Sequence, residues 1–232
     1  VRAEILKGTV SQAALDRLSP SRVRATTRWE RMYVFGPDID YEPTKEKCVV
    51  TIAERTGRTP QEVAYDYLTE GLDRFLYCPV VNYGEGNLES TREMMLDSGT
   101  LMGLSDGGAH CGSVVDASMP SYLLAYWARD RTRGPRLELE RVVKAQTAET
   151  ADFFGFSDRG RLSPGLRADV NLIDHERLSL KAPHLVEDLP SGGRRLVQGA
   201  HGYVATLVAG ETVFEHGEHT GALPGKLVRA GR

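Results

Sequence analysis

The sequence is poor in cysteine, and its cysteines lack the spacing of a paired site. Among 232 residues there are three, Cys48, Cys78 and Cys111, and no two of them form a C-x-x-C pair. This disfavours both a disulfide framework and a zinc ribbon, because each needs paired cysteines. Cys48 and Cys78 lie in apolar runs, where a cysteine acts as a small core side chain. We therefore expect a cytoplasmic protein.

An excess of one charge and a long apolar run are also missing. The net charge is −3 with both signs interspersed, so no basic face predicts a nucleic-acid partner. No uncharged apolar run approaches the roughly 20 residues of a membrane helix, so we expect no membrane partner. The chain begins with VRAEI, which is neither a signal peptide nor an initiator segment. We expect it to be part of a longer protein.

Histidine is scarce, and the histidines present do not form a metal motif. None stands in a His-x-His pair. His216 and His219 lie in a glycine-rich segment of strand or turn character, where two rings need not converge as they do on one helix face. A solvated loop is the favoured interpretation of this pair. The histidines are residues 110, 175, 184, 201, 216 and 219.

The first part of the chain alternates helical patterns with short apolar runs. Residues 59–62 (TPQE) open a helix, with threonine at the N-cap, proline at the first position and glutamate closing a capping box. Buried strands are expected at residues 75–81 and 100–104, with a helix at 87–96 between them. This order predicts parallel βα units, and hence an α/β fold.

After about residue 156 the sequence becomes rich in glycine and contains short runs typical of β-strands. We expect helices at residues 121–130 and 137–154, the latter broken near Thr147. Alternation at residues 168–173, and a β-hairpin from 203–208 into 212–214, predict a small antiparallel β module. Residues 181–199 are expected to form a long surface loop. The expected domains are residues 1–156 and 157–232.

The stretch Gly103 to His110 (GLSDGGAH) combines a carboxylate, small residues and an imidazole directly after an apolar run. Small residues allow close approach of backbone and substrate, and an aspartate at the end of a barrel strand is where barrel enzymes keep their chemistry. The alternative is that Asp106 caps the next segment and that His110 is an ordinary loop histidine. Cys111 has no second base positioned by sequence to activate it, which disfavours a nucleophile.

Other candidate residues have structural alternatives of equal or greater weight. Asn82, Tyr83 and Glu85 follow the expected strand 75–81 and form either a substrate-side loop or a plain connection. Asp116 is either a second carboxylate of the active site or the cap of the helix that follows it. For Arg129 and Arg131 there are two interpretations: one of them binds a substrate carboxylate, or both belong to the solvent-exposed end of a helix. The second interpretation is favoured.

Several segments, in their order along residues 28–229, resemble the C-terminal half of metal-dependent amidohydrolases. The loop at residues 82–89 and the tail at 221–227 resemble the N-acyl-D-amino-acid deacylase (D-aminoacylase) branch. The segments that carry the wider resemblance are the Asp106 loop and residues 147–151, 158–170 and 208–211.

The resemblance implies the C-terminal part of a (β/α)8 TIM-like barrel, followed by a small antiparallel β-sandwich module. It implies that Asp106 lies at the metal, moves a proton from water to the leaving nitrogen, and is itself a metal ligand. It implies that His110 contacts the substrate. The family's His-x-His and its other principal ligands are missing here, so the resemblance places them outside this chain, in an N-terminal half or a partner chain.

These observations lead to one main hypothesis and two alternatives. The main hypothesis is zinc-dependent hydrolysis of the amide of an N-acyl-D-amino acid, with one or two zinc ions. Asp106 is then the catalytic residue, and His110, Asn82 and Tyr83 bind the substrate. One alternative is hydrolysis of cyclic amides, as in hydantoinases and dihydroorotases. The other is a non-catalytic fragment that requires the missing N-terminal half.

Overall fold

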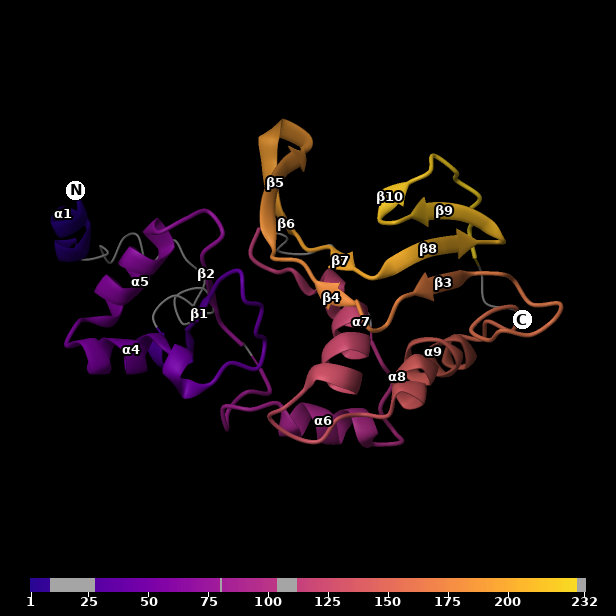
Figure 1. Ribbon diagram of the computed structural model, residues 1–232, viewed down its shortest axis with the longest axis horizontal. Helices are drawn as coiled ribbons and strands as arrows, with labels where there is room; N and C mark the ends of the chain where they lie inside the picture. Colours follow the sequence, from indigo (N-terminus) through magenta and orange to yellow (C-terminus); the bar gives the residue numbers. More distant parts are fainter. Residues whose placement is uncertain (9–27, 80, 104–111, 229–232) are drawn as a thin grey trace. The chain divides into compact units, whose positions relative to one another are not determined.

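A computed structural model describes residues 1–8, 28–79, 81–103 and 112–228 of the chain (Figure 1). The chain divides into two compact units, Val1–Glu93 and Met94–Arg232. Both units combine helices with β-strands, so the chain has a mixed α/β fold. The expected domains 1–156 and 157–232, and the barrel they imply, stay predictions. No helix in the described residues has the length and apolar character needed to cross a membrane.

The first unit is built around two short helices that pack on each other. Cys48 precedes α4, and the capping box predicted at Thr59 and Glu62 is present at the start of α5. The Thr59 side chain accepts a hydrogen bond from Glu62 N at 3.3 Å, and Glu62 Oε2 accepts one from Thr59 N at 2.8 Å. The helices of this unit are α1 (Arg2–Lys7), η1 (Trp29–Arg31), η2 (Lys45–Lys47), α4 (Val49–Thr56), α5 (Pro60–Thr69) and α6 (Glu89–Leu96), which runs on past Glu93.

Among the described residues of the first unit, apolar side chains form two core groups. One contains Val49 and Val63 from the facing helices. The other contains Tyr33, Cys48 and Tyr83. The prediction that Cys48 is a core residue is thus confirmed.

The strands of the first unit correct the prediction of parallel pairing. β1 (Tyr33–Phe35) and β2 (Phe75–Tyr77) pair antiparallel. The strand expected at residues 75–81 is shorter than predicted, because β1 offers only three residues as partners. The strand expected at residues 100–104 is wrong for residues 100–103, which belong to no strand or helix among the described residues.

The helices of the second unit follow the predicted pattern. Two helices meet at Thr147, whose φ of −125° and ψ of −86° break the run, as predicted. The helix predicted at residues 121–130 is present, but residues Leu123–Asp130 form a π-helix. The helices are η3 (Asp116–Ser118), α7 (Met119–Tyr122), η4 (Leu123–Asp130), α8 (Leu139–Gln146), α9 (Ala148–Phe153) and η5 (Pro190–Gly192).

The strands of the second unit that the structure describes pair antiparallel, as predicted, whereas the separate β-sandwich module stays a prediction. Three pairs are nested along the chain: β5 with β6, β4 with β7 outside them, and β3 with β8 outside both. β8, β9 and β10 then follow one another in the sheet β10-β9-β8-β3, as Figure 1 shows. The strands are β3 (Val170–Ile173), β4 (Ser179–Leu180), β5 (His184–Leu189), β6 (Gly193–Val197), β7 (Ala200–His201), β8 (Tyr203–Val208), β9 (Glu211–Glu215) and β10 (Glu218–His219).

The β5–β6 hairpin overturns the prediction of a long surface loop at residues 181–199. Its turn uses Ser191 and Gly192 with φ of 64° and 72°, a conformation that favours glycine. Arg195 forms a two-point ion pair with Asp188 at 2.7 Å across the strands. The proline, glycines and charges that suggested a loop are thus the turn and the cross-strand pairs of a hairpin.

Candidate functional site

Two of the predicted site residues, Asp106 and His110, lie outside the described residues, as does Cys111. The predicted role of Asp106 as the catalytic residue and metal ligand therefore stays a prediction. Asn82 and Tyr83 are described, and they lie in the loop between β2 and α6.

Tyr83 anchors the start of this loop in the core of the first unit. Its side chain is buried, and its hydroxyl donates a hydrogen bond to the carbonyl of Pro43 at 2.5 Å. Its ring meets Tyr33 edge-on, with 5.8 Å between the ring centroids. The hydroxyl is therefore committed to the fold, whereas the neighbouring Asn82 is exposed.

Glu42 anchors the other end of the same loop, and no sequence pattern had singled it out. Its side chain is fully buried (0% exposed), and its Oε1 accepts a hydrogen bond from Leu88 N at 2.8 Å. A buried carboxylate is rare unless it is hydrogen-bonded or paired. The glutamate-proline dipeptide at residues 42 and 43 thus holds both Tyr83 and Leu88. The only sequence signal was an acidic residue flanked by tyrosine and proline.

The two anchors hold the loop at Tyr83 and Leu88, and the exposed residues lie beside and between them. Asn82 has a φ of 58°, which asparagine tolerates better than most residues. Its backbone carbonyl lies 3.5 Å from Ser90 Oγ, which donates to it. Gly84 and Glu85 are exposed. A loop of this kind can present polar groups in a constant position.

The described residues do not assemble the donor set that zinc requires. No group of three or more histidine, cysteine, aspartate or glutamate side chains comes together in residues 1–8, 28–79, 81–103 and 112–228. His216 lies in the turn between β9 and β10, and His219 is the last residue of β10. The ring of His219 meets Phe214 edge-on at 5.0 Å, and its Nδ1 accepts from Gly221 N at 3.0 Å. We therefore derive no chemical step through a metal from this part of the chain.

Cys78 is half-buried, and burial raises the pKa of its thiol, with Arg31 as the main opposing influence. A raised pKa keeps the sulfur protonated at neutral pH, where it is a poor nucleophile and a poor metal ligand. This agrees with the predicted role of Cys78 as a small apolar side chain.

Two arginines considered as carboxylate ligands are occupied within the second unit. Arg129 forms a two-point ion pair with Asp130 at 2.6 Å and donates to the carbonyl oxygens of His175, Glu176 and Leu178. Arg131 is 1% exposed, and its guanidinium lies 4.6 Å from the ring of Trp127. The prediction of a solvated helix end is wrong for Arg131, because it is buried.

Comparison with known proteins identifies the family. The model of the amidohydrolase family matches residues 12–214 of the chain. The chain belongs to the amidohydrolase family. The match includes the Asp106 loop and both ends of the Asn82 loop.

Relatives of this amidohydrolase chain are considerably longer. Uncharacterized proteins of Mycobacterium tuberculosis and Mycobacterium bovis are each 28% identical to it over 254 residues. The alignment covers 97% of this chain and 41% of each relative. The chain thus spans about two-fifths of the length of the curated relatives it matches.

Solved structures similar to the chain include three of D-aminoacylase, one of them a variant in complex with copper chloride and one addressing a binuclear metal centre. The identities are 21–22% and the TM-scores 0.41–0.44, covering 83–87% of this chain and 36–38% of D-aminoacylase. At these TM-scores the likeness by itself carries no further conclusion.

Proposed function

We propose that this chain is the C-terminal part of a zinc-dependent amidohydrolase that removes the acyl group from N-acyl-D-amino acids. The observation that carries the proposal is the amidohydrolase match over residues 12–214, which spans the Asp106 loop. The choice of N-acyl-D-amino acids rests on the sequence resemblance of residues 82–89 and 221–227 to that branch.

In this proposal Asp106 carries the proton transfer. Its carboxylate takes a proton from the water that attacks the amide carbonyl and delivers it to the leaving nitrogen. Such general acid–base catalysis contributes typically about 10²–10⁴-fold to the rate. His110 contacts the substrate. Asn82 supplies an exposed amide to the substrate, and Tyr83 supports Asn82 from the core through its hydrogen bond to Pro43.

The zinc ligands of this proposal, Asp106 included, lie outside the described residues. A zinc ion supplies a Lewis acid, and the remaining ligands come from an N-terminal half of the same enzyme or from a partner chain. We propose a cytoplasmic location from the cysteine content alone.

The test replaces Asp106→Asn in the longest available form of the enzyme. We expect hydrolysis of an N-acetyl-D-amino acid to fall at least about 10²-fold while bound zinc changes little, because the amide cannot take up the proton. Asp97→Asn is the matched control: Asp97 Oδ1 accepts from Gly99 N at 2.7 Å, which an asparagine oxygen can also do. Undiminished turnover in Asp106→Asn would refute the role of Asp106.

A second candidate is hydrolysis of cyclic amides. The spacing from Asp106 to His110 resembles the dihydroorotase-like pattern, which favours it. Assaying hydantoin and dihydroorotate beside N-acetyl-D-amino acids separates the candidates, because the Asp106→Asn variant should lose whichever activity the enzyme has.

A further inference from the structure

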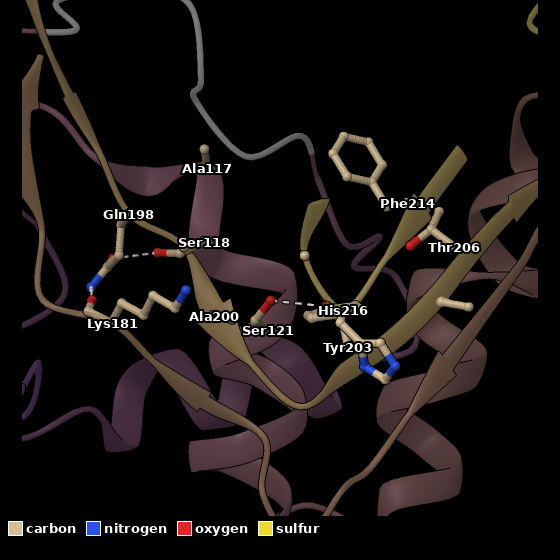
Figure 2. A pocket seen from close by; sticks show the side chains of 13 residues that line it. Ala117, Ser118, Ser121, Lys181, Gln198, Ala200, Tyr203, Thr206, Phe214 and His216 are labelled. Carbon is tan, nitrogen blue, oxygen red and sulfur yellow. Dashed lines mark hydrogen bonds between the residues drawn. The ribbon is translucent and has the colours of Figure 1, made fainter. Parts of the chain in front are cut away.

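The second unit contains a cavity of about 270 Å³ that belongs to none of the predicted site residues (Figure 2). Its wall comes from the segment around η3 and α7, from the strands β7, β8 and β9, and from residues 181 and 198 beside the β5–β6 hairpin. Segments far apart in the sequence therefore meet here within one unit.

Side-chain hydrogen bonds hold the wall in place. Ser121 Oγ and Tyr203 Oη lie 2.9 Å apart, which connects the end of α7 to β8. Ser118 Oγ donates to Gln198 Oε1 at 2.6 Å, and Gln198 Nε2 donates to the carbonyl of Lys181 at 2.9 Å. Figure 2 shows both bridges at the cavity. The cavity is thus built by cross-links between elements and is more than a gap between them.

The charge of the wall is positive. Lys181 has its backbone fixed, since its N donates to Gly199 O at 2.8 Å, but its ammonium has no partner among the described residues. The His216 imidazole also has none, and its backbone N is held by Val204 O at 2.9 Å. The described residues that line the cavity include no aspartate and no glutamate. A lysine ammonium without a counter-ion attracts an anion.

The wall also has an apolar part. Phe214 is 42% exposed and presents its ring at the cavity, and the alanines at 117, 200 and 205 leave room beside it. Ligand sites commonly occupy roughly 300–1,000 Å³, so this cavity suits a small molecule. An anion with an apolar group fits both halves of the wall better than a fully hydrated inorganic ion.

We propose that this cavity binds a small organic carboxylate, with Lys181 holding the carboxylate and Phe214 packing on its apolar part. The hydroxyls of Ser121 and Tyr203 are within the same wall; one donates to the other, and the accepting hydroxyl keeps its proton to donate to a carboxylate oxygen. This inference does not depend on amide hydrolysis, because it uses no residue of the proposed catalytic site.

The experiment measures binding of benzoate to the chain by titration calorimetry and by NMR of the His216 ring, assigned with a His216→Gln variant. Benzamide is the neutral probe of the same shape, and acetate and inorganic phosphate lack the apolar ring. We expect benzoate to bind and to shift the His216 resonances, acetate and phosphate to bind at least about tenfold more weakly, and benzamide not to bind.

Two variants test the wall directly. Lys181→Met keeps the apolar stem and removes the charge, and we expect at least a tenfold loss of benzoate affinity. Lys144→Met is the control, because Lys144 pairs with Glu149 at 3.1 Å and does not line the cavity. Ala117→Trp fills the cavity from an exposed position and should abolish binding without touching the lysine.

Several results would overturn the proposal. The proposal is wrong if the unmodified chain does not bind benzoate, or if it binds benzoate and benzamide with equal affinity. It is also wrong if a folded Lys181→Met variant binds benzoate as tightly as the unmodified chain. Tight binding of phosphate alone would assign the cavity to inorganic anions instead. Asp106→Asn should leave benzoate binding unchanged, so failure here is distinguishable from failure of the proposed hydrolase function.

Discussion

At the scale of single residues, the first unit depends on buried polar groups that each hold a remote segment. Glu42 and Tyr83 are both buried, and their hydrogen bonds link residues 42–43 to the two ends of the loop before α6. Buried polar groups cost free energy when they lose a partner, so such residues tolerate substitution poorly. Both residues hold the loop before α6 in place, and the predicted contact of Tyr83 with a substrate stays a prediction.

Removing the Tyr83 hydroxyl should destabilise the protein measurably. Tyr83→Phe keeps the ring on Tyr33 and loses the hydrogen bond to Pro43, which should lower the free energy of unfolding by about 1–2 kcal/mol. Tyr65→Phe is the control, because the Tyr65 hydroxyl bonds no other described residue, and it should change stability by less than about 0.5 kcal/mol. Urea unfolding measures both, and equal effects would contradict the assignment.

At the scale of elements, caps and tight crossings decide where helices and strands can lie. The capping box at Thr59 holds the start of α5. Gly202, between β7 and β8, crosses the backbone of residues 174–178 so closely that Asp174 N donates to Gly202 O at 2.8 Å. The capping box involves neighbouring residues, and the crossing depends on the close approach at Gly202, so one substitution can test each of them.

Alanine at position 202 should disrupt the crossing. Gly202 has a φ of 95°, and an added Cβ would lie 2.7 Å from Leu178 Cα and 2.9 Å from Asp174 O. Backbone atoms cannot move aside cheaply, so we expect Gly202→Ala to cost about 3 kcal/mol or more. Gly217→Ala, with a φ of 89° and open space around it, should cost only about 1 kcal/mol. Similar losses in thermal or urea unfolding would argue against a close crossing.

The capping box should make stability depend on pH. Hydrogen bonds from the backbone N and the hydroxyl of Thr59 lower the pKa of Glu62 below its usual value, with Arg2 and Arg58 contributing. The contribution of the ionised carboxylate is therefore complete above the pKa of an unfolded glutamate, about 4.3. It is lost as the pH falls through the lower folded-state pKa.

Thermal unfolding of the wild type and Glu62→Gln measures this effect. The glutamine oxygen can still accept from Thr59, so the variant removes the charge alone. We expect the melting temperatures to differ most near neutral pH and to converge in acid. A difference that is constant across this range would exclude the carboxylate as its source.

Some elements were predictable because their signals are local. The capping box at Thr59, the break at Thr147 and the turn between β8 and β9 each need only a few adjacent residues. The pairing of β1 with β2 was not predictable, because the short apolar run at residues 75–77 does not show which strand it will meet.

In the candidate site and in the β5–β6 hairpin, too, local features were predictable and contacts between distant residues were not. The loop between β2 and α6 was expected because it follows the apolar run at residues 75–81, but its anchoring by Glu42 depends on a contact with Leu88 that no spacing reveals. The charged hairpin of β5 and β6 was missed because its turn residues and ion pairs also suit a solvated loop. The roles of Asp106 and His110 stay predictions.

At the scale of the whole molecule, the chain covers about two-fifths of its relatives and exposes large apolar side chains. Phe153 is 70% exposed and Leu162 is 84% exposed. Single exposed apolar side chains are normal on protein surfaces, so the partial coverage of the relatives is what points to further segments. We therefore propose that the activity belongs to a larger assembly, formed with an N-terminal half or a partner chain.

Zinc content should depend on that assembly. We expect the 232-residue chain by itself to retain less than one zinc per molecule after dialysis, because its described part assembles no ligand group. The longer enzyme should retain about one or two zinc ions. Elemental analysis measures both, and full zinc occupancy of the isolated chain would place the ligands within residues 1–232.

The nesting of β5–β6 inside β4–β7, and of both inside β3–β8, has a consequence for the order of folding. Pairing β3 with β8 in an open chain would require closing the whole segment between Ile173 and Tyr203. Once the central hairpin has formed, the remaining loop is shorter, and the entropy lost on closure falls with loop length. Each pairing thus brings the next pair of strands together, and we expect the three pairs to form from the Ser191 turn outward.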